Sequence, residues 1–214
     1  MQKTIHFPEE TRAGFTFPAH TITWKQDLAH IKKSFPPHDL EIFLSLYALA
    51  QTHPKKAKKE GESFFRKYPT HPKVLNLLTF ILLSLKKIRQ AQDLIEKNYE
   101  YNPDYLFAKI NYADQCIQAK KTEKVPEIFD GKFSLKELYP EKKVFHISEF
   151  RGFMMMMGFY HLAIGEREKA IFYHEIIYRI DPHHPSTKTL QKKIYFRPFY
   201  KRFCAKFVSF LSCV

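Results

Sequence analysis

The stretch from residue 151 to residue 185 constrains the fold most, because its apolar pattern predicts two helices joined by a short turn. Gly165 marks the end of the first helix, since glycine enters the left-handed conformation at little cost. The second helix ends before Pro182. We expect Gly158 and Ala170, which are both small, to face each other and to let the two helices pack closely.

The interval between an alanine and a closing proline recurs along the chain. The pairs are Ala57 and Pro69, Ala91 and Pro103, and Ala170 and Pro182. The first two pairs lie about 34 residues apart, which is the length of a tetratricopeptide repeat. Over roughly residues 38 to 195 the chain resembles the tetratricopeptide repeat family, with histidine at two aromatic positions. The matching positions are Met154, Met157, Gly158, His161, Ala170, His174 and Pro182.

The resemblance implies the fold class and the domain organisation. We expect an all-α protein, a tetratricopeptide-like solenoid of α-α hairpins with N-terminal and C-terminal capping helices. Residues 1–21 are expected to be an extended arm, residues 22–195 the helical-repeat domain, and residues 196–214 a basic, aromatic C-terminal helix. No sheet of more than two short strands is expected. The arm either lies on the solenoid or is a disordered leader.

The hairpin units are uneven along the chain. The first and second units would span residues 38–69 and 72–103, and a fourth would span residues 151–185. The third unit starts well at Asp104, but prolines and a glycine predict an irregular insert within residues 121–147. Capping helices are expected over residues 24–35 and 186–194, where they would cover apolar surface of the terminal units.

Charge and cysteine content bound the class of protein. The chain has 214 residues, a formal net charge of +13 and a pI of about 9.5. The positive charge is consistent with a lysine-rich surface that is only solvated. It is equally consistent with a surface that binds an acidic protein, a nucleic acid or an anionic membrane. The 3 cysteines have no C-x-x-C spacing, which favours a reducing compartment. The first residues contain no apolar signal core. We therefore expect a cytoplasmic location.

The sequence contains no recognised catalytic motif. We find no glycine-rich phosphate loop, no nucleophile elbow and no metalloprotease motif. His161 and His174 are expected to face each other across the last hairpin as core histidines. We therefore expect a non-enzymatic protein with no catalytic residues, no metal and no cofactor. An enzyme with an unrecognised site is a further hypothesis, beside the two binding functions described below.

In the tetratricopeptide repeat family, the first helix of each repeat lines a concave face on which peptides bind. Some members hold a C-terminal carboxylate there, but only Asn76 fits that use in this chain. The resemblance therefore implies a protein-interaction scaffold for an apolar or amphipathic segment, and a secretion-chaperone role is one version of it. The partner-binding positions carried over by spacing are Ile42, Leu46, Asn76, Phe80, Leu83, Ile110, Asp114, Met155, Phe159 and Leu162.

The C-terminal segment offers an alternative function. Its phenylalanines recur at helical spacing, and its lysines and arginines fall mainly off that stripe. A basic face opposite an aromatic one is typical of a helix that lies in a membrane interface. The stripe either caps the solenoid or makes the protein a peripheral binder of anionic membranes or nucleic acid. Its residues are Phe199, Phe203, Phe207 and Phe210.

Overall fold

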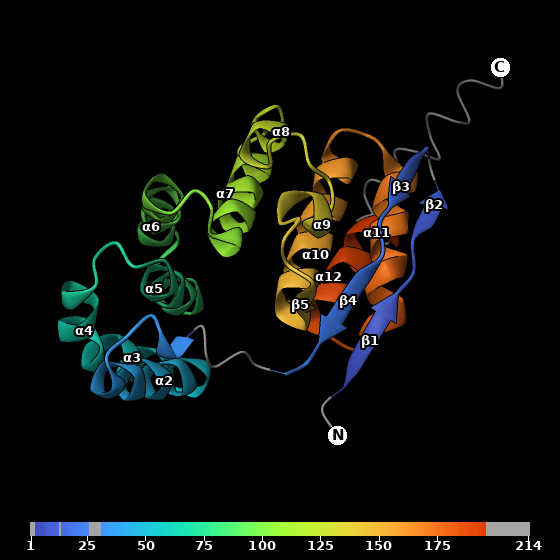
Figure 1. Ribbon diagram of the computed structural model, residues 1–214. Helices are drawn as coiled ribbons and strands as arrows, with labels where there is room; N and C mark the ends of the chain where they lie inside the picture. Colours follow the sequence, from blue (N-terminus) through green and yellow to red (C-terminus); the bar gives the residue numbers. More distant parts are fainter. Residues whose placement is uncertain (1–2, 13, 26–30, 196–214) are drawn as a thin grey trace, which may run out of the picture.

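The computed structural model describes residues 3–12, 14–25 and 31–195, and most of these residues are helical (Figure 1). The helices are α2 (Pro37–Thr52), α3 (Pro54–Glu60), α4 (Glu62–Lys67), α5 (Pro72–Ser84), α6 (Ile88–Tyr101), α7 (Leu106–Gln118), α8 (Lys124–Ile128), α9 (Leu135–Leu138), α10 (Ile147–Ala163), α11 (Arg167–Ile180) and α12 (Pro185–Tyr195). The strands are β1 (Thr4–Phe7), β2 (Glu10–Arg12), β3 (Phe15–Phe17), β4 (His20–Thr23) and β5 (Val144–His146).

Consecutive helices pair as hairpins. The pairs α2 with α3, α5 with α6, and α10 with α11 pack directly against each other. The alanines of the recurring interval, Ala57, Ala91 and Ala170, are all 0% exposed, so each is fully buried in its unit. The second helix of the first unit is interrupted at Gly61, which separates α3 from α4. The chain is therefore mostly an array of helical hairpins, as the sequence predicts.

The expectation of an all-α protein is wrong in one respect, because the chain contains a three-stranded sheet. Its strand order is β1-β4-β5, and β2 and β3 form a separate two-stranded sheet. Strand β4 is antiparallel to β1, with Thr4 opposite Thr23, and parallel to β5, with Thr21 opposite Val144. The N-terminal residues therefore pair with a strand from the predicted insert, which is how the sheet gains its third strand.

The insert also contains two short helices, α8 and α9, where the sequence predicts irregular chain. A complete capping box begins α9, since the Ser134 hydroxyl accepts from the Glu137 backbone and the Glu137 carboxylate accepts from the Ser134 backbone. Helix α10 begins at Ile147, earlier than the expected Arg151. The fourth hairpin is therefore longer than predicted at its N-terminal end.

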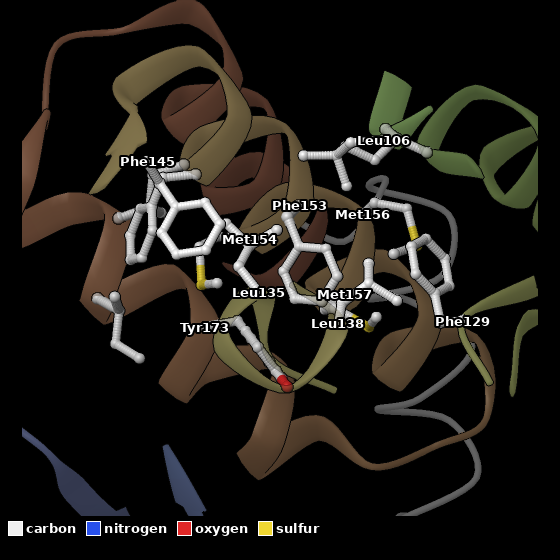
Figure 2. Close-up of a cluster of buried hydrophobic side chains, with 14 of the residues drawn as sticks. Leu106, Phe129, Leu135, Leu138, Phe145, Phe153, Met154, Met156, Met157 and Tyr173 are labelled. Carbon is white, nitrogen blue, oxygen red and sulfur yellow. The ribbon is translucent and has the colours of Figure 1, made fainter. Parts of the chain in front are cut away.

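The larger hydrophobic core lies in the C-terminal half of the chain. Figure 2 shows Phe153, Met154 and Met157 of α10 packed with Phe145 of β5 and Tyr173 of α11. Burial of each such side chain stabilises the fold by about 1.5–3 kcal/mol. Side chains of the N-terminal arm belong to this core as well. The core therefore joins the arm, the insert and the last hairpin.

A second core lies between α2, α3, α4 and α5 and includes Phe35 and Phe43, whose rings stack with centroids 5.0 Å apart. Of the expected N-terminal capping helix, residues 31 and 32 are helical, whereas residues 24 and 25 are not. Thr23 ends β4, and Trp24 packs against the larger core, whereas Ile31 and Phe35 pack against the smaller one. Residues 26–30 of that expected helix lie outside the described part of the chain.

Helix α12 covers the last hairpin and contacts both α10 and α11. Leu190 of α12 lies against Gly158 of α10, where a β-carbon would come within 2.6 Å of Leu190 Cδ2. The nearest neighbour of Gly158 is therefore Leu190 of α12, a partner that the sequence does not predict, and the missing side chain makes room for α12. None of the described helices has the length and apolarity that crossing a membrane requires.

Candidate functional site

The first helices of the hairpins form one layer. Helix α2 contacts α5, α5 contacts α7, and α7 contacts α10. The side-chain amide of Asn111 on α7 donates a hydrogen bond of 2.9 Å to the side-chain oxygen of Asn76 on α5. Figure 1 shows α2, α5 and α7 on the side that turns toward α10 and β5, with α4 and α6 on the outer side. Uncovered side chains of this layer are therefore the candidates for partner binding.

Two predicted partner-binding residues on α5 are exposed. Phe80 and Leu83 each have 45% of their surface accessible. They lie three residues apart on the helix, so they project from one face. The positions that are neither buried nor fully exposed are Ile42, Asn76, Asp114, Met155 and Leu162.

Three predicted partner-binding residues are buried, so these predictions are wrong. Leu46 is part of the smaller core. Ile110 packs against α10, where its Cδ1 atom lies 3.3 Å from the position of a β-carbon on Gly152. Phe159 lies under α12 in a cluster with Leu190. In each case a neighbouring element covers a face that the repeat spacing alone leaves open.

Sequence reasoning missed a second exposed apolar pair, Leu44 and Tyr47 on α2, which are 40% and 49% exposed. These residues also lie three positions apart and share one face of the helix. Helix α2 carries apolar residues all round, so its spacing does not distinguish the core face from the open face. We name the exposed surface of Leu44, Tyr47, Phe80 and Leu83 the inner apolar surface.

A group of tyrosines lies where α2 approaches the C-terminal half. Burial raises the pKa of Tyr105, and the nearby Glu149, Tyr47 and Tyr139 raise it further. These four side chains come from α2, from the residue before α7, from the residue after α9 and from α10. The Tyr139 hydroxyl donates to the Asp104 carbonyl at 2.9 Å. Tyr105 and Tyr139 are therefore neutral phenols next to Tyr47, at one end of the inner apolar surface.

Basic residues follow α5 and form most of α3 in the sequence. Lys86 and Lys87, both exposed, follow Leu85, the C-cap residue of α5. Helix α3, which packs against α2 and α5, carries the lysine run of the sequence. The run is Lys55, Lys56, Lys58 and Lys59. Asp114 of α7 is the acidic member of the predicted set, and burial raises the pKa of its carboxyl group.

The two histidines of the last hairpin have separate surroundings. The His161 ring stacks on Tyr173 with centroids 5.3 Å apart, and its Nδ1 atom lies 2.7 Å from the Glu166 carboxylate. His174 instead contacts the rings of Tyr178 and Tyr195. Both histidines are buried, and their expected face-to-face arrangement is not the one observed.

Within the described ranges, no group of three or more histidine, cysteine, aspartate or glutamate side chains has an arrangement that could hold a metal ion. Phe199, Phe203, Phe207 and Phe210 lie outside the described residues. The membrane or nucleic-acid function that depends on them stays a prediction.

Comparison with known proteins gives little. No protein-family model and no curated protein matches the sequence. Among solved structures, the chain is similar to a mutant of MamA, with 13% sequence identity, a TM-score of 0.48, and coverage of 74% of this chain and 86% of that chain. A likeness of this degree says nothing about function. Membership of the tetratricopeptide repeat family stays a prediction from the sequence.

Proposed function

We propose that the protein is a non-enzymatic interaction scaffold that binds an amphipathic protein segment on the inner apolar surface. The observation that supports this most is the pair of exposed apolar side chains on each of two adjacent first helices, α2 and α5. Exposed apolar patches on a folded chain mark interaction sites. Helix α2 also places Tyr47 near Tyr105, and tyrosine is enriched at protein interfaces.

The chemistry of the surface selects the kind of segment. Apolar residues three apart on two helices match the i, i+3 and i+4 anchors of an amphipathic helix. Lys86 and Lys87 at the end of α5 and the lysines of α3 favour acidic residues beside those anchors. The proposed partner is therefore a protein segment with one apolar face and acidic flanks.

Selection from a displayed library of helical peptides on the full-length chain tests this proposal. Selected peptides are expected to have apolar anchors at helical spacing with flanking acids. Phe80→Glu is expected to lower their affinity at least about tenfold, because it places a charge against the apolar anchors.

Tyr101→Glu is the matched control, since Tyr101 is 53% exposed on the outer helix α6. It should leave the affinity unchanged. The proposal fails if no peptide is enriched over an unrelated basic protein, or if Phe80→Glu and Tyr101→Glu have equal effects.

A further inference from the structure

A pocket of about 550 Å³ lies between β2, α11 and α12, outside the inner apolar surface. Its volume falls in the range of about 300–1,000 Å³ that is typical of small-molecule sites. Figure 1 shows β2 alongside α11, and α12 packs against α11. The lining residues are Glu10, Arg12, His174, Glu175, Tyr178, Arg179, Gln191 and Tyr195.

The imidazole ring of His174, which lines this pocket, is buried without hydrogen-bond partners in the described part of the chain. The residue is 4% exposed, and neither ring nitrogen has a hydrogen-bond partner in the described part of the chain. Burial lowers the pKa of His174, and the nearby Glu175 opposes this only in part, so the ring is neutral near pH 7. A neutral imidazole has one N–H donor and one bare acceptor nitrogen. Buried polar groups of this kind are normally paired.

Two aromatic rings flank the imidazole. The ring centroids of Tyr178 and Tyr195 each lie 5.7 Å from that of His174. Tyr178 is 48% exposed and Tyr195 is 42% exposed, so both rings border the solvent. Side chains with this exposure change rotamer within nanoseconds. His174 lines the pocket together with both rings.

The charged residues of the pocket neutralise one another. Arg12 pairs with Glu175, and Arg179 pairs with Glu10 at 2.7 Å. The two pairs leave no excess charge among the lining residues. Gln191 adds a neutral amide that can donate and accept. The pocket therefore favours a neutral ligand over an ion.

We propose that this pocket binds a neutral, planar ring compound that carries a hydrogen-bond donor next to an acceptor, as nucleobases and aromatic carboxamides do. The ring stacks against Tyr178 and Tyr195. Its donor or its acceptor pairs with one of the two nitrogens of His174, both of which are unpaired within the described residues.

Ligand-observed NMR and calorimetric titration of the full-length chain test the proposal, with nicotinamide and adenosine as probes. Cyclohexanecarboxamide is the matched control compound, because it keeps the amide and lacks the planar ring. Saturable binding is expected for at least one planar probe, and binding of the saturated compound is expected to be at least about tenfold weaker.

His174→Phe keeps a planar ring of similar size and removes both nitrogens. This variant is expected to lower the affinity for the planar probe at least about tenfold. The melting temperature should not fall, because the substitution removes no hydrogen bond of the described protein. If this variant does not fold, Tyr178→Ala takes its place, with Tyr101→Ala as a control at a similarly exposed tyrosine.

Three results would overturn the proposal: no saturable binding of either planar probe, equal affinity for cyclohexanecarboxamide, or unchanged affinity in His174→Phe. The proposal would also fail if Tyr178→Ala lowers the affinity for the planar probe no more than Tyr101→Ala does. Phe80→Glu separates this site from the peptide surface, since it should leave probe binding unchanged.

Discussion

At the scale of single residues, Gly158 determines how closely α12 approaches α10. A β-carbon on Gly158 would lie 2.6 Å from Leu190 Cδ2 and 2.9 Å from Leu190 Cδ1. Both contacts are shorter than packed carbon atoms allow. Leu190 is 0% exposed, so it has little room to move aside. The glycine is therefore a packing requirement of the C-terminal cap.

We predict that Gly158→Leu lowers the free energy of unfolding by about 1–3 kcal/mol, because it overpacks the contact with Leu190. Urea unfolding measures this change. Leu190→Ala in the same chain should recover part of the loss, so the double variant is more stable than the sum of the single effects implies. An unchanged midpoint in Gly158→Leu would contradict the prediction.

Residues of the candidate site could be predicted only where their exposure depends on their own helix and not on elements distant in the sequence. Phe80 and Leu83 follow from the helical spacing of α5, and both are exposed. Phe159 fits the same spacing but is covered by α12, which lies later in the chain. The pocket around His174 also depends on β2, far away in the sequence. Such environments cannot be read from spacing, because they arise from elements that meet only in the folded chain.

At the scale of elements, three first helices end in the same cap. Lys86, Lys120 and Gly165 have φ angles of 57°, 60° and 86°, in the left-handed region. Beyond each of them, the next amide donates to the carbonyl five residues back, as in the Schellman motif. Glycine is the usual residue in such a cap, so the sequence predicts only the cap at Gly165. Lys86 and Lys120 adopt the same backbone conformation although they are not glycines.

We predict that Lys86→Gly and Lys120→Gly each raise the free energy of unfolding, by up to about 1 kcal/mol. A lysine pays a steric penalty in the left-handed conformation, and glycine does not. Thermal unfolding of each variant checks the prediction. Lys87→Gly is the control, because Lys87 has a φ of −87° and should not gain from the change. Equal shifts in all three variants would refute the explanation.

The helices of this fold are more predictable than its sheet for a physical reason. Helical stripes and closing prolines are local signals, and they locate the unit that contains α5 and α6, the start of α7 and the end of α11 to within a few residues. Strand β5 has 3 residues, and its partner β4 lies near the other end of the sequence. A pairing so short and so distant leaves no periodic pattern of its own. The three-stranded sheet was therefore outside the reach of sequence reasoning.

At the scale of the whole molecule, the N-terminal arm joins the two ends of the sequence. Phe7, Phe17 and Ile22 are buried in the larger core with residues of α10 and α11. The ring of Phe17 contacts Phe150 with centroids 6.2 Å apart. The chain then leads into α2, which belongs to the smaller core. The stability of the C-terminal half therefore depends on the first residues of the chain.

His20 in β4 makes the packing of the N-terminal arm against the larger core sensitive to acid. Its Nδ1–H donates to the Pro18 carbonyl at 2.6 Å, and its Nε2 atom is buried without a hydrogen-bond partner in the described residues. Burial lowers the pKa of His20 from 6.5 to about 4; Lys136 lowers it further, while the Pro18 carbonyl and Glu137 act in the opposite direction. Protonation would place a charge next to Phe17, on which the His20 ring stacks at 4.7 Å.

The sign of the effect follows from the two pKa values. Because the pKa is lower in the folded state, the unfolded chain binds a proton first as the pH falls. The contribution of His20 to stability is complete above about pH 6.5 and is lost progressively down to about pH 4, for a total of about 3 kcal/mol. His71, His146, His161, His174 and His184 also have lowered pKa values, so the whole chain shares this trend.

We therefore predict that His20→Phe reduces the loss of stability between about pH 6.5 and pH 4, because phenylalanine keeps the stacked ring and cannot take up a proton. Urea unfolding at several pH values measures the slope, and proteolysis within residues 1–23 reports release of the arm. His183→Phe is the control: His183 is exposed, and its slope should equal that of the wild type. If His20→Phe has the wild-type slope as well, then His20 does not control docking of the arm, and the acid sensitivity belongs to the other buried histidines.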